Sequence, residues 1–399
     1  MQVRGNEFFQ GTLAQRNEFE SVRIFDTTLR DGEQTPRTSF SYDDKRAIAA
    51  ALDDANVDVI EAGFPANSEQ EAEAVADIAA STETTTCGLA RVVESDVEAA
   101  VDSGVEMIHV FASTSDVQIE DSMHSTREDV VARSVAAVEQ AADAGVEVMF
   151  SPMDATRTDP EFLAEIVEAV DEVGVDWINI PDTCGVGTPK RFGELVEFVG
   201  QHTDARIDVH THDDFGLATA NALTGVEYGA DQMQVSVNGI GERAGNAAFE
   251  EVVMAAESLY GAETGVDTTA ITEISQLVAE RSSVPIPVNK PVVGANAFAH
   301  ESGIHAAGVL ENSETFEPGV MTPEMVGAER EVVLGKHSGT HAVRDQLEEA
   351  GYDPTDEEVR EVTKKVKAHA GDDEVVTDAV LRAFAGEVGV DRVTEEVKA

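Results

Sequence analysis

Arg206-Ile-Asp-Val-His-Thr-His-Asp213 is a short run in which apolar and polar residues alternate before two histidines, a pattern typical of a β-strand. Because side chains on a strand alternate between its two sides, His210 and His212 should point the same way. Much earlier in the chain, Val22-Arg-Ile-Phe-Asp-Thr-Thr-Leu29 predicts another strand, and Asp31 lies just past its end. Two imidazoles and a carboxylate at strand ends would form a divalent-metal site if the fold brings them together.

The segments between and around these two strands alternate between strand-like and helix-like patterns. Further apolar, β-branched runs predict strands at Val57–Phe64, Thr84–Arg91, Met107–Thr114, Val146–Met153, Trp177–Thr183 and Gln232–Ile240. Helical segments separate the strands at Asp43–Asn56, Ser68–Ala80, Glu94–Gly104, Thr126–Gly145, Pro160–Gly174, Pro189–Gln201, Leu217–Gly229 and Ala247–Tyr260. This rhythm predicts an α/β fold, a parallel (β/α)8 TIM barrel. A doubly wound sheet is the alternative, but the glycine-rich phosphate loop that usually follows its first strand is missing.

Closure of such a barrel would make its first and last strands neighbours. Asp31, His210 and His212 would then meet at the C-terminal ends of the strands, where these barrels carry their active sites. The loop after the eighth strand, Asn238-Gly-Ile-Gly-Glu-Arg-Ala-Gly-Asn246, would lie on the same face. A lone histidine is more often a satisfied core residue, but a His-x-His pair near a separately placed carboxylate favours a metal site.

The amino-acid composition indicates the character of the protein surface and says little about the substrate. The formal net charge is −51, from 78 acidic and 27 basic residues, while 42% of the residues are hydrophobic. The acidic residues are spread along predicted helix faces, which is typical of a globular protein in a salt-rich cytosol, where screening weakens self-repulsion. We therefore expect a cytoplasmic protein from a salt-adapted organism. Nucleic acid and anionic membranes are disfavoured as partners.

The absence of targeting signals and the number of cysteines also favour a cytoplasmic protein. The chain has no apolar run of membrane-spanning length, and Met1–Glu20 is polar and mixed in charge, unlike a signal peptide. The two cysteines, Cys87 and Cys184, fall on the predicted third and sixth strands and give no disulfide framework. Both are expected to be small core residues in a reducing compartment.

The pattern changes after the barrel. Four parts are predicted: a flexible arm over residues 1–21, the barrel over 22–265, a linker and lid-like subdomain over 266–340, and an acidic helical subdomain over 341–399. The proline-rich run Val284–Pro291 in the linker cannot be one continuous helix. Helices are expected at Thr269–Arg281, His341–Ala350, Asp356–Ala370 and Thr377–Glu387.

Six motifs, spread in order along most of the chain, resemble those of one enzyme family. They are Phe25-Asp-Thr-Thr-Leu-Arg-Asp-Gly-Glu-Gln34, Ile60-Glu-Ala-Gly-Phe-Pro65, Ile180-Pro-Asp-Thr183, His210-Thr-His-Asp213, Asn238-Gly-Ile-Gly-Glu-Arg-Ala-Gly-Asn246 and Leu334-Gly-Lys-His-Ser-Gly339. The similarity runs from about Val22 to Tyr352 and identifies the chain as a member of the metal-dependent acyl-CoA condensing enzymes. This family includes the 2-isopropylmalate, citramalate and homocitrate synthases.

The resemblance assigns the metal centre. It makes Asp31, His210 and His212 metal ligands, with Asn246 as the fourth, for a divalent ion that could be Mn, Mg, Zn or Co. It also places Arg30 beside the metal as a catalytic and substrate-binding residue.

Other roles follow from the same resemblance. Glu33 is a further catalytic candidate, while Thr183 and Ser151 are substrate-binding candidates, Thr183 for the carboxylate of a 2-oxo acid. His305 matches a catalytic histidine that reaches over the barrel of a partner subunit, which implies a homodimer with exchanged C-terminal parts. Lys336 is either structural or a cofactor contact.

The implied reaction is a Claisen-type condensation of acetyl-CoA with a 2-oxo acid, followed by thioester hydrolysis. Homocitrate synthases present a basic residue and a histidine to the distal carboxylate of 2-oxoglutarate, whereas the matching positions here are Met149 and Leu89. An unpaired carboxylate against apolar walls is costly, so the pattern favours 2-oxoisovalerate and leucine biosynthesis, with pyruvate as the alternative. Because the chain ends at Ala399, without a further regulatory domain, we expect no feedback inhibition by leucine.

Two positions depart from the family pattern and keep other functions open. Met153 stands where relatives usually have a glutamate, and Phe316 where they have a tyrosine. The replacements suggest a paralogue with slowed or redirected chemistry, in which Asp154 or a water substitutes, or a non-catalytic binding protein. Lyases and biotin-dependent carboxyltransferases share the barrel and metal ligands, but carboxyltransferases need a barrel lysine, and Lys45 and Lys190 are predicted on helices.

Overall fold

The computed structural model describes residues 19–300, 320–371 and 375–393. Its contacts divide the chain into two compact units, with the boundary between Ile286 and Pro287. No helix in the described part is long and apolar enough to cross a membrane.

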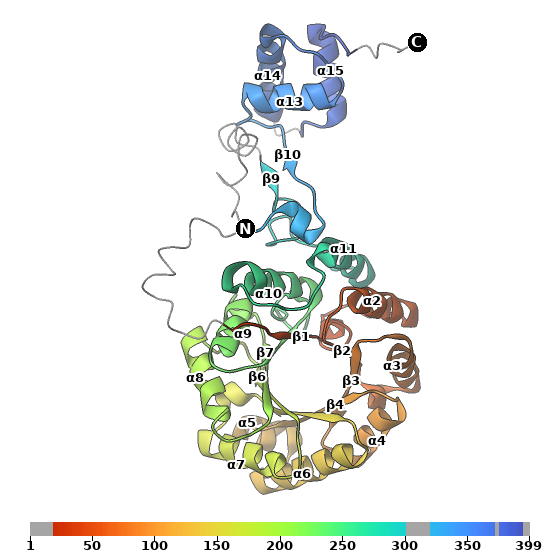
Figure 1. Ribbon diagram of the computed structural model, residues 1–399, viewed down its shortest axis with the longest axis vertical. Helices are drawn as coiled ribbons and strands as arrows, with labels where there is room; N and C mark the ends of the chain where they lie inside the picture. Colours follow the sequence, from red (N-terminus) through yellow and green to blue (C-terminus); the bar gives the residue numbers. More distant parts are fainter. Residues whose placement is uncertain (1–18, 301–319, 372–374, 394–399) are drawn as a thin grey trace. The chain divides into compact units, whose positions relative to one another are not determined.

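The first unit is a closed barrel of eight parallel strands in sequence order (Figure 1). The strands are β1 Arg23–Asp26, β2 Val59–Gly63, β3 Thr85–Arg91, β4 Met107–Ser113, β5 Glu147–Met153, β6 Trp177–Asp182, β7 Arg206–Thr211 and β8 Gln232–Val235. The barrel closes because β1 pairs with β8 as well as β2, in a register that sets Arg23 opposite Gln232 and Asp26 opposite Val235. The predicted (β/α)8 barrel is confirmed.

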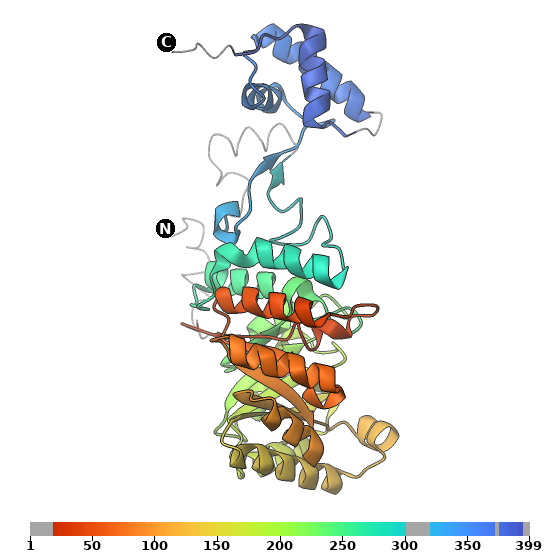
Figure 2. The same ribbon diagram turned by 90° about the vertical axis from the view of Figure 1, so that its right-hand side faces the viewer.

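Helices surround the strands, and Figure 2 shows α2 and α3 side by side on the outside of the barrel. The helices of this unit are α2 Tyr42–Asp54, α3 Glu69–Ser81, α4 Glu94–Asp102, α5 Asp116–Gln118, α6 Arg127–Asp143, α7 Pro160–Asp171, α8 Pro189–Val199, α9 Ala218–Glu227, α10 Phe249–Ala255 and α11 Ile271–Ser282. Side-chain caps set several starts, as where Ser41 and Asp44 form a capping box on α2.

Short helical turns fill the connections, and the sequence patterns did not predict them. They are η1 Gly32–Gln34, η2 Pro65–Asn67, η4 Ala155–Arg157, η5 Val237–Gly239 and η7 Thr268–Ala270, with π-helical turns η3 Ile119–Met123 and η6 Ala256–Tyr260. The eighth strand is shorter than predicted and ends at Val235, because Asn238 and Gly239 adopt left-handed φ angles of 62° and 69°. Cys184 lies in the turn after β6 and is only half-buried, so it is not a core residue.

The barrel interior is built in layers by the two-residue repeat of its strands. One layer is a dry cluster of Phe25, Val59, Cys87, Met107, Met149 and Trp177. Two residues further along the same strands the inward side chains become polar, as at Glu61, His109, Ser151 and Asn179. On these four strands the inward side chains therefore change from apolar to polar toward the C-terminal end of the barrel.

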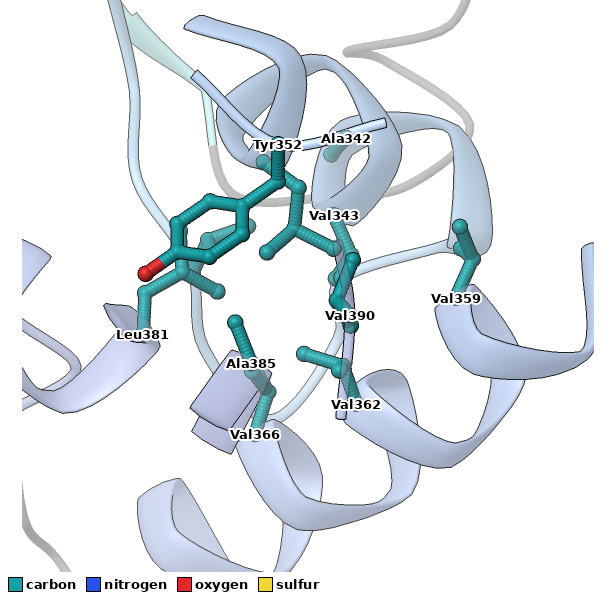
Figure 3. Packing of buried hydrophobic residues seen from close by; sticks show 11 residues of the cluster. Ala342, Val343, Tyr352, Val359, Val362, Val366, Leu381, Ala385 and Val390 are labelled. Atoms are coloured by element: carbon teal, nitrogen blue, oxygen red, sulfur yellow. The ribbon is translucent and has the colours of Figure 1, made fainter. Parts of the chain in front are cut away.

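Among the described residues of the second unit, three helices pack around their own core, α13 Thr340–Glu349, α14 Asp356–Gly371 and α15 Asp378–Val388. Figure 3 shows Val343, Val362 and Leu381 meeting in this cluster. The unit also holds the turn η9 Pro323–Val326 and a short parallel pair, β9 Ala299–His300 and β10 Glu331–Val332. The predicted helices of the tail are present within two residues of their expected bounds.

Candidate active site and metal centre

Asp31, His210 and His212 come together at the C-terminal end of the barrel. Asp31 begins the turn η1 after β1, His210 lies on β7, and His212 follows β7 and forms a β-bridge with Asn246. All four residues are buried, and ligand atoms of the first three lie within 4.8 Å of one another. Strand closure therefore joins residues that are far apart in the sequence.

The side chains of these four residues are arranged so that a cation could bind between them. The Nε2 atoms of His210 and His212 lie 3.1 Å apart, close to the ~3 Å expected for two ligands about 2.1 Å from one ion at a right angle. Asn246 Nδ2 donates to Asp31 Oδ2 at 2.6 Å and to the Ile240 carbonyl at 3.1 Å. Its Oδ1 is buried and has no hydrogen-bond partner among the described residues. A buried acceptor left without a partner in this way calls for an explanation, and a bound cation could provide one.

Electrostatics keep the ligands in the forms that bind metal. Burial, together with the neighbouring His212, lowers the pKa of His210 to about 3, so its ring is neutral at physiological pH. Burial alone would raise the pKa of Asp31, but the charge of Arg30, with the hydrogen bond from Asn246, outweighs it and lowers that pKa below the usual range. The centre thus offers one carboxylate and two neutral imidazoles.

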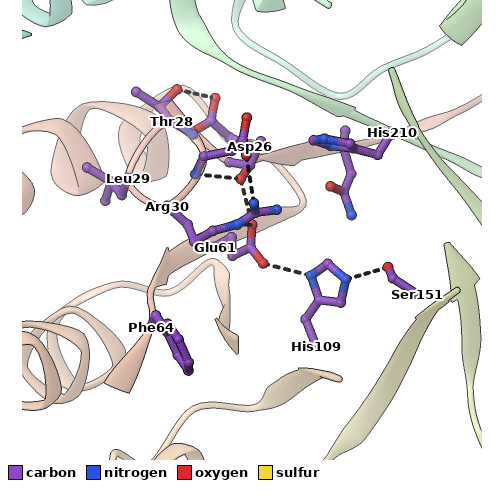
Figure 4. Close-up of polar contacts among 12 residues, drawn as sticks. Asp26, Thr28, Leu29, Arg30, Glu61, Phe64, His109, Ser151 and His210 are labelled. Carbon is purple, nitrogen blue, oxygen red and sulfur yellow. Dashed lines mark hydrogen bonds and ion pairs between the residues drawn. The ribbon is translucent and has the colours of Figure 1, made fainter. Parts of the chain in front are cut away.

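Arg30 connects the metal centre to the polar layer of the barrel (Figure 4). Its NH1 donates to Asp31 Oδ1 at 2.8 Å, and its Nε donates to Glu61 Oε2 at 2.7 Å. Arg30 outweighs the effect of burial on Glu61, with help from His109, and holds the pKa of Glu61 well below its usual range. Two carboxylates therefore fix the guanidinium beside the metal ligands.

A chain of hydrogen bonds continues from Glu61 across the barrel. His109 Nδ1 lies 2.7 Å from Glu61 Oε1, and His109 Nε2 lies 2.6 Å from Ser151 Oγ. Ser151 donates to Asn179 Oδ1 at 2.9 Å, and Asn179 Nδ2 donates to Asp208. Glu61, His109 and Asn179 were missed as site residues, although each is a polar residue at an inward position of an otherwise apolar strand, which could have indicated them.

A cavity of about 260 Å³ opens above this layer and contains most of the predicted substrate residues. Its walls include Arg30, Leu89, His109, Phe111, Ser151, Met153, Asn179, Pro181, Thr183, Gln234 and Arg243. Met149, expected in the substrate pocket, is instead fully buried in the apolar layer below. The reason is the strand repeat, since Ser151 occupies the next inward position on β5 and covers it.

Glu33 is not brought to the cavity. Its carboxylate lies 2.8 Å from Lys45 Nζ and accepts a hydrogen bond from the Phe40 backbone at 3.0 Å. Glu33 thus helps to neutralise a buried lysine on α2 rather than facing the metal ligands. His305 and Phe316 lie outside the described residues.

Asp154 does not supply a carboxylate to the cavity beside Met153. It is fully buried, and its oxygens accept hydrogen bonds from Arg157 and from Ser115, the latter at 2.5 Å. Its backbone N–H donates to Thr183 Oγ1 at 2.8 Å. Asp154 therefore orients Thr183, a residue of the cavity wall, and is not placed to replace a missing glutamate.

The chain is similar to known families and proteins. Residues 21–278 match the HMGL-like family, and residues 292–374 match the homocitrate synthase post-HMGL domain-like family. A probable 2-isopropylmalate synthase of Methanosarcina mazei is 50% identical over 370 residues, 92% of this chain and 72% of that protein. The 2-isopropylmalate synthase of Sulfolobus acidocaldarius is 47% identical over 380 residues, 94% of this chain and 97% of that protein.

Two other proteins widen the comparison. A putative (R)-citramalate synthase of Methanopyrus kandleri is 46% identical over 374 residues, 92% of this chain and 73% of that protein. The crystal structure of hydroxymethylglutaryl-CoA lyase from Pseudomonas aeruginosa matches with a TM-score of 0.58 and 28% identity, over 65% of this chain and 93% of that one.

Proposed function

The chain belongs to the HMGL-like family, and from this premise we propose that it condenses acetyl-CoA with a 2-oxo acid, as a 2-isopropylmalate synthase does. The observation that carries the proposal is the buried cluster of Asp31, His210 and His212 beside Arg30, at the mouth of a cavity of small-molecule size. The 44% identity to the 2-isopropylmalate synthase of Methanocaldococcus jannaschii, over 96% of this chain, also supports it.

Asp31, His210, His212 and Asn246 would hold the divalent ion that such a reaction uses. When bound, this ion polarises the ketone of the 2-oxo acid as a Lewis acid. These ligands are compatible with several ions: a carboxylate, two imidazoles and an amide oxygen suit Mn, Zn or Co, and Mg with added waters.

Residues of this chain would carry out the other steps of the reaction. Arg30 stays charged, because Glu61 and Asp31 outweigh the effect of burial and raise its pKa, and it provides positive charge where an alkoxide develops. Thr183 Oγ1 accepts a hydrogen bond from the Asp154 backbone, so its own O–H can be directed at the substrate carboxylate. We assign the removal of a proton from the acetyl methyl group to His305, with a second copy of the chain as the expected partner.

The cavity favours a 2-oxo acid with an apolar tail. Leu89, Phe111 and Met153 are among its apolar walls, and its two arginines are already paired. Arg30 binds Asp31 and Glu61, while Arg243 binds Asp214 at 2.7 Å. A distal carboxylate would find no unpaired cation among the described lining residues, which favours 2-oxoisovalerate over 2-oxoglutarate. Pyruvate is the second candidate, supported by the relative named as a citramalate synthase.

Product analysis tests this proposal. The protein is incubated with acetyl-CoA, Mn²⁺ and an equimolar mixture of 2-oxoisovalerate, pyruvate and 2-oxoglutarate, and the products are identified by mass spectrometry. We expect 2-isopropylmalate as the main product, and none after chelation of the metal. Homocitrate as the main product would overturn the substrate assignment, and the absence of any condensation product would overturn the reaction.

A further inference from the structure

The loop between β8 and α10 carries Asn246, the amide of the metal centre, and one residue anchors this loop. Asn238 has a left-handed φ of 62°, and three hydrogen bonds hold it there. Its backbone N–H donates to Glu250 Oε2 at 2.9 Å, and its Nδ2 donates to the Ser275 carbonyl at 2.9 Å. Its Oδ1 accepts a hydrogen bond from the Ser275 hydroxyl. Both ends of the Asn238 amide are therefore fixed by a single residue of α11.

The anchored segment in turn holds Asn246. The carbonyl of Gly239, the next residue after Asn238, accepts the Asn246 backbone N–H at 3.1 Å. The carbonyl of Ile240 accepts Asn246 Nδ2 at 3.1 Å, the same amide nitrogen that donates to Asp31. Two carbonyls just after Asn238 thus hold Asn246, that of Gly239 through its backbone and that of Ile240 through its side-chain amide.

The partner on α11 is well placed for this role. Ser275 is 1% exposed, and α11 packs against η5, the turn that contains Asn238. A left-handed conformation costs about 1–3 kcal/mol for a residue other than glycine unless its surroundings compensate. The paired contacts with Ser275 supply that compensation, since they satisfy both the oxygen and the nitrogen of the part-buried Asn238 amide.

We propose that Asn238 and Ser275 are positioning residues of the metal centre, through which α11 sets the affinity for the divalent ion. The inference rests on the proposed metal site, and it adds residues that do not touch the metal. Loss of the Ser275 hydroxyl would let the loop carbonyls shift, and with them the Asn246 side chain whose Nδ2 donates to Asp31. Outer residues that orient metal ligands typically change metal affinity by about 10–100-fold.

The test is the affinity of the full chain for Mn²⁺, measured by calorimetry and by the electron paramagnetic resonance signal of free Mn²⁺. Ser275→Ala removes the hydroxyl but keeps the carbonyl, and we expect it to raise the Mn²⁺ dissociation constant about 10-fold. Ser282→Ala is the matched control, because Ser282 is a buried serine of the same helix whose hydroxyl accepts the Val284 N–H instead. It should bind Mn²⁺ as the wild type does.

A second variant tests the same interaction if Ser275→Ala folds poorly. Asn238→Gly tolerates the positive φ and removes the whole side-chain clamp, so it should weaken Mn²⁺ binding by a similar factor. Combining both changes should add little, since they remove the same interaction. Wild-type affinity in Ser275→Ala and Asn238→Gly would overturn the inference. Failure of the wild type itself to bind Mn²⁺ would instead contradict the proposed metal site.

Discussion

His210 and His212 differ from ordinary core histidines in how their nitrogens are arranged. Their Nε2 atoms face each other at 3.1 Å, and both Nδ1 atoms are buried without a hydrogen-bond partner among the described residues. A cation bound between the two Nε2 atoms would explain why the rings are held in this way. The carboxylate of Asp31 supplies the negative charge that the two rings lack.

Removing that charge should empty the site. We expect Asp31→Asn to bind Mn²⁺ at least about 100-fold more weakly and to lose condensation activity, because the amide keeps the shape of the side chain but not its charge. Equilibrium dialysis with Mn²⁺ measures the first effect, and CoA release measures the second. Asp129→Asn, on the exposed face of α6, is the control and should change neither. Full Mn²⁺ affinity in Asp31→Asn would exclude Asp31 as a ligand.

Met153 faces the cavity at a position where the family pattern has a glutamate. A carboxylate there can carry a proton, and general acid–base groups contribute about 10²–10⁴-fold to rate. We expect Met153→Glu to raise kcat several-fold with little change in KM for the 2-oxo acid, measured by steady-state kinetics. Met153→Gln has a similar size but no charge and should give no gain. A rate in Met153→Glu no higher than in Met153→Gln would count against slowed proton transfer in the native chain.

Asp26 should make stability depend on pH. Burial, opposed in part by the hydrogen bonds of Thr28, raises the pKa of Asp26 to about 7, whereas an unfolded chain releases this proton near pH ~4. The native state therefore holds the proton that the unfolded state has lost, and the stabilisation fades as pH rises from about 4 to about 7. Asp26→Asn lacks this dependence.

We accordingly expect the stability of Asp26→Asn, relative to the wild type, to increase by up to about 3 kcal/mol between pH 5 and pH 8. Urea unfolding at each pH, followed by circular dichroism, measures the difference. A constant difference between the two proteins across this range would show that Asp26 is ionised in the folded chain.

At the scale of single residues, the sequence predicted the site residues that belong to strong local motifs. It missed the residues whose role depends on how deep they lie inside the barrel. Asp31, His210 and His212 stand at strand ends in recognisable patterns, and the structure brings them together. Glu61 and His109 lie inside apolar strands, where a single polar residue resembles a satisfied core residue. Which layer Met149 occupies depends on the stagger of the strands around the barrel, which no single strand reveals.

Helices and strands were predicted well where a long periodic pattern of apolar residues marks them. They were predicted poorly where local backbone dihedral angles determine their ends. The strands and long helices appear within a few residues of their expected bounds, because burial of one face imposes the periodicity. The end of β8 was wrong since Val237 and Ile240 continue the apolar pattern, while Asn238 and Gly239 turn the backbone. Turns such as η1 and η4 depend on local hydrogen bonds that leave no periodic trace.

Two glycines of α15 should respond in opposite ways to the same change. Gly386 lies inside the helix and nothing would touch an added Cβ, so Gly386→Ala should stabilise α15 by about 0.5–1 kcal/mol. Gly389 ends the helix with a φ of 86°, where alanine is strained, and Gly389→Ala should destabilise it by a similar amount. Hydrogen exchange of the α15 amides in the full chain measures both. Effects of the same sign would contradict the observed end of the helix.

The whole molecule carries a net charge of −51, and this charge must be screened for the chain to stay compact. Raising KCl from 0.1 to 1 M shortens the screening length from about 10 Å to about 3 Å. We expect the Tm to rise across this range, measured by differential scanning calorimetry, and to rise less with sucrose at equal osmolality. A Tm that falls with KCl would contradict adaptation to salt.

At this scale the barrel followed from the eightfold alternation of strands and helices, which favoured it over a doubly wound sheet. The reaction class followed from six motifs in order, and the relatives agree with it. Substrate choice depends on a few wall residues, and of the two predicted for it Leu89 lines the cavity while Met149 lies in the apolar layer below. The roles of His305 and Phe316 remain predictions, because both lie outside the described residues.

The central claim is that this chain joins acetyl-CoA to a 2-oxo acid, and free-thiol release tests it most directly. The assay runs in molar KCl with Mn²⁺, separately with 2-oxoisovalerate, pyruvate and 2-oxoglutarate, and kcat/KM is compared. We expect metal-dependent CoA release that is fastest with 2-oxoisovalerate, slower with pyruvate and slowest with 2-oxoglutarate. No release with any of the three, from folded protein that binds Mn²⁺, would contradict the claim and favour a binding protein on the same barrel.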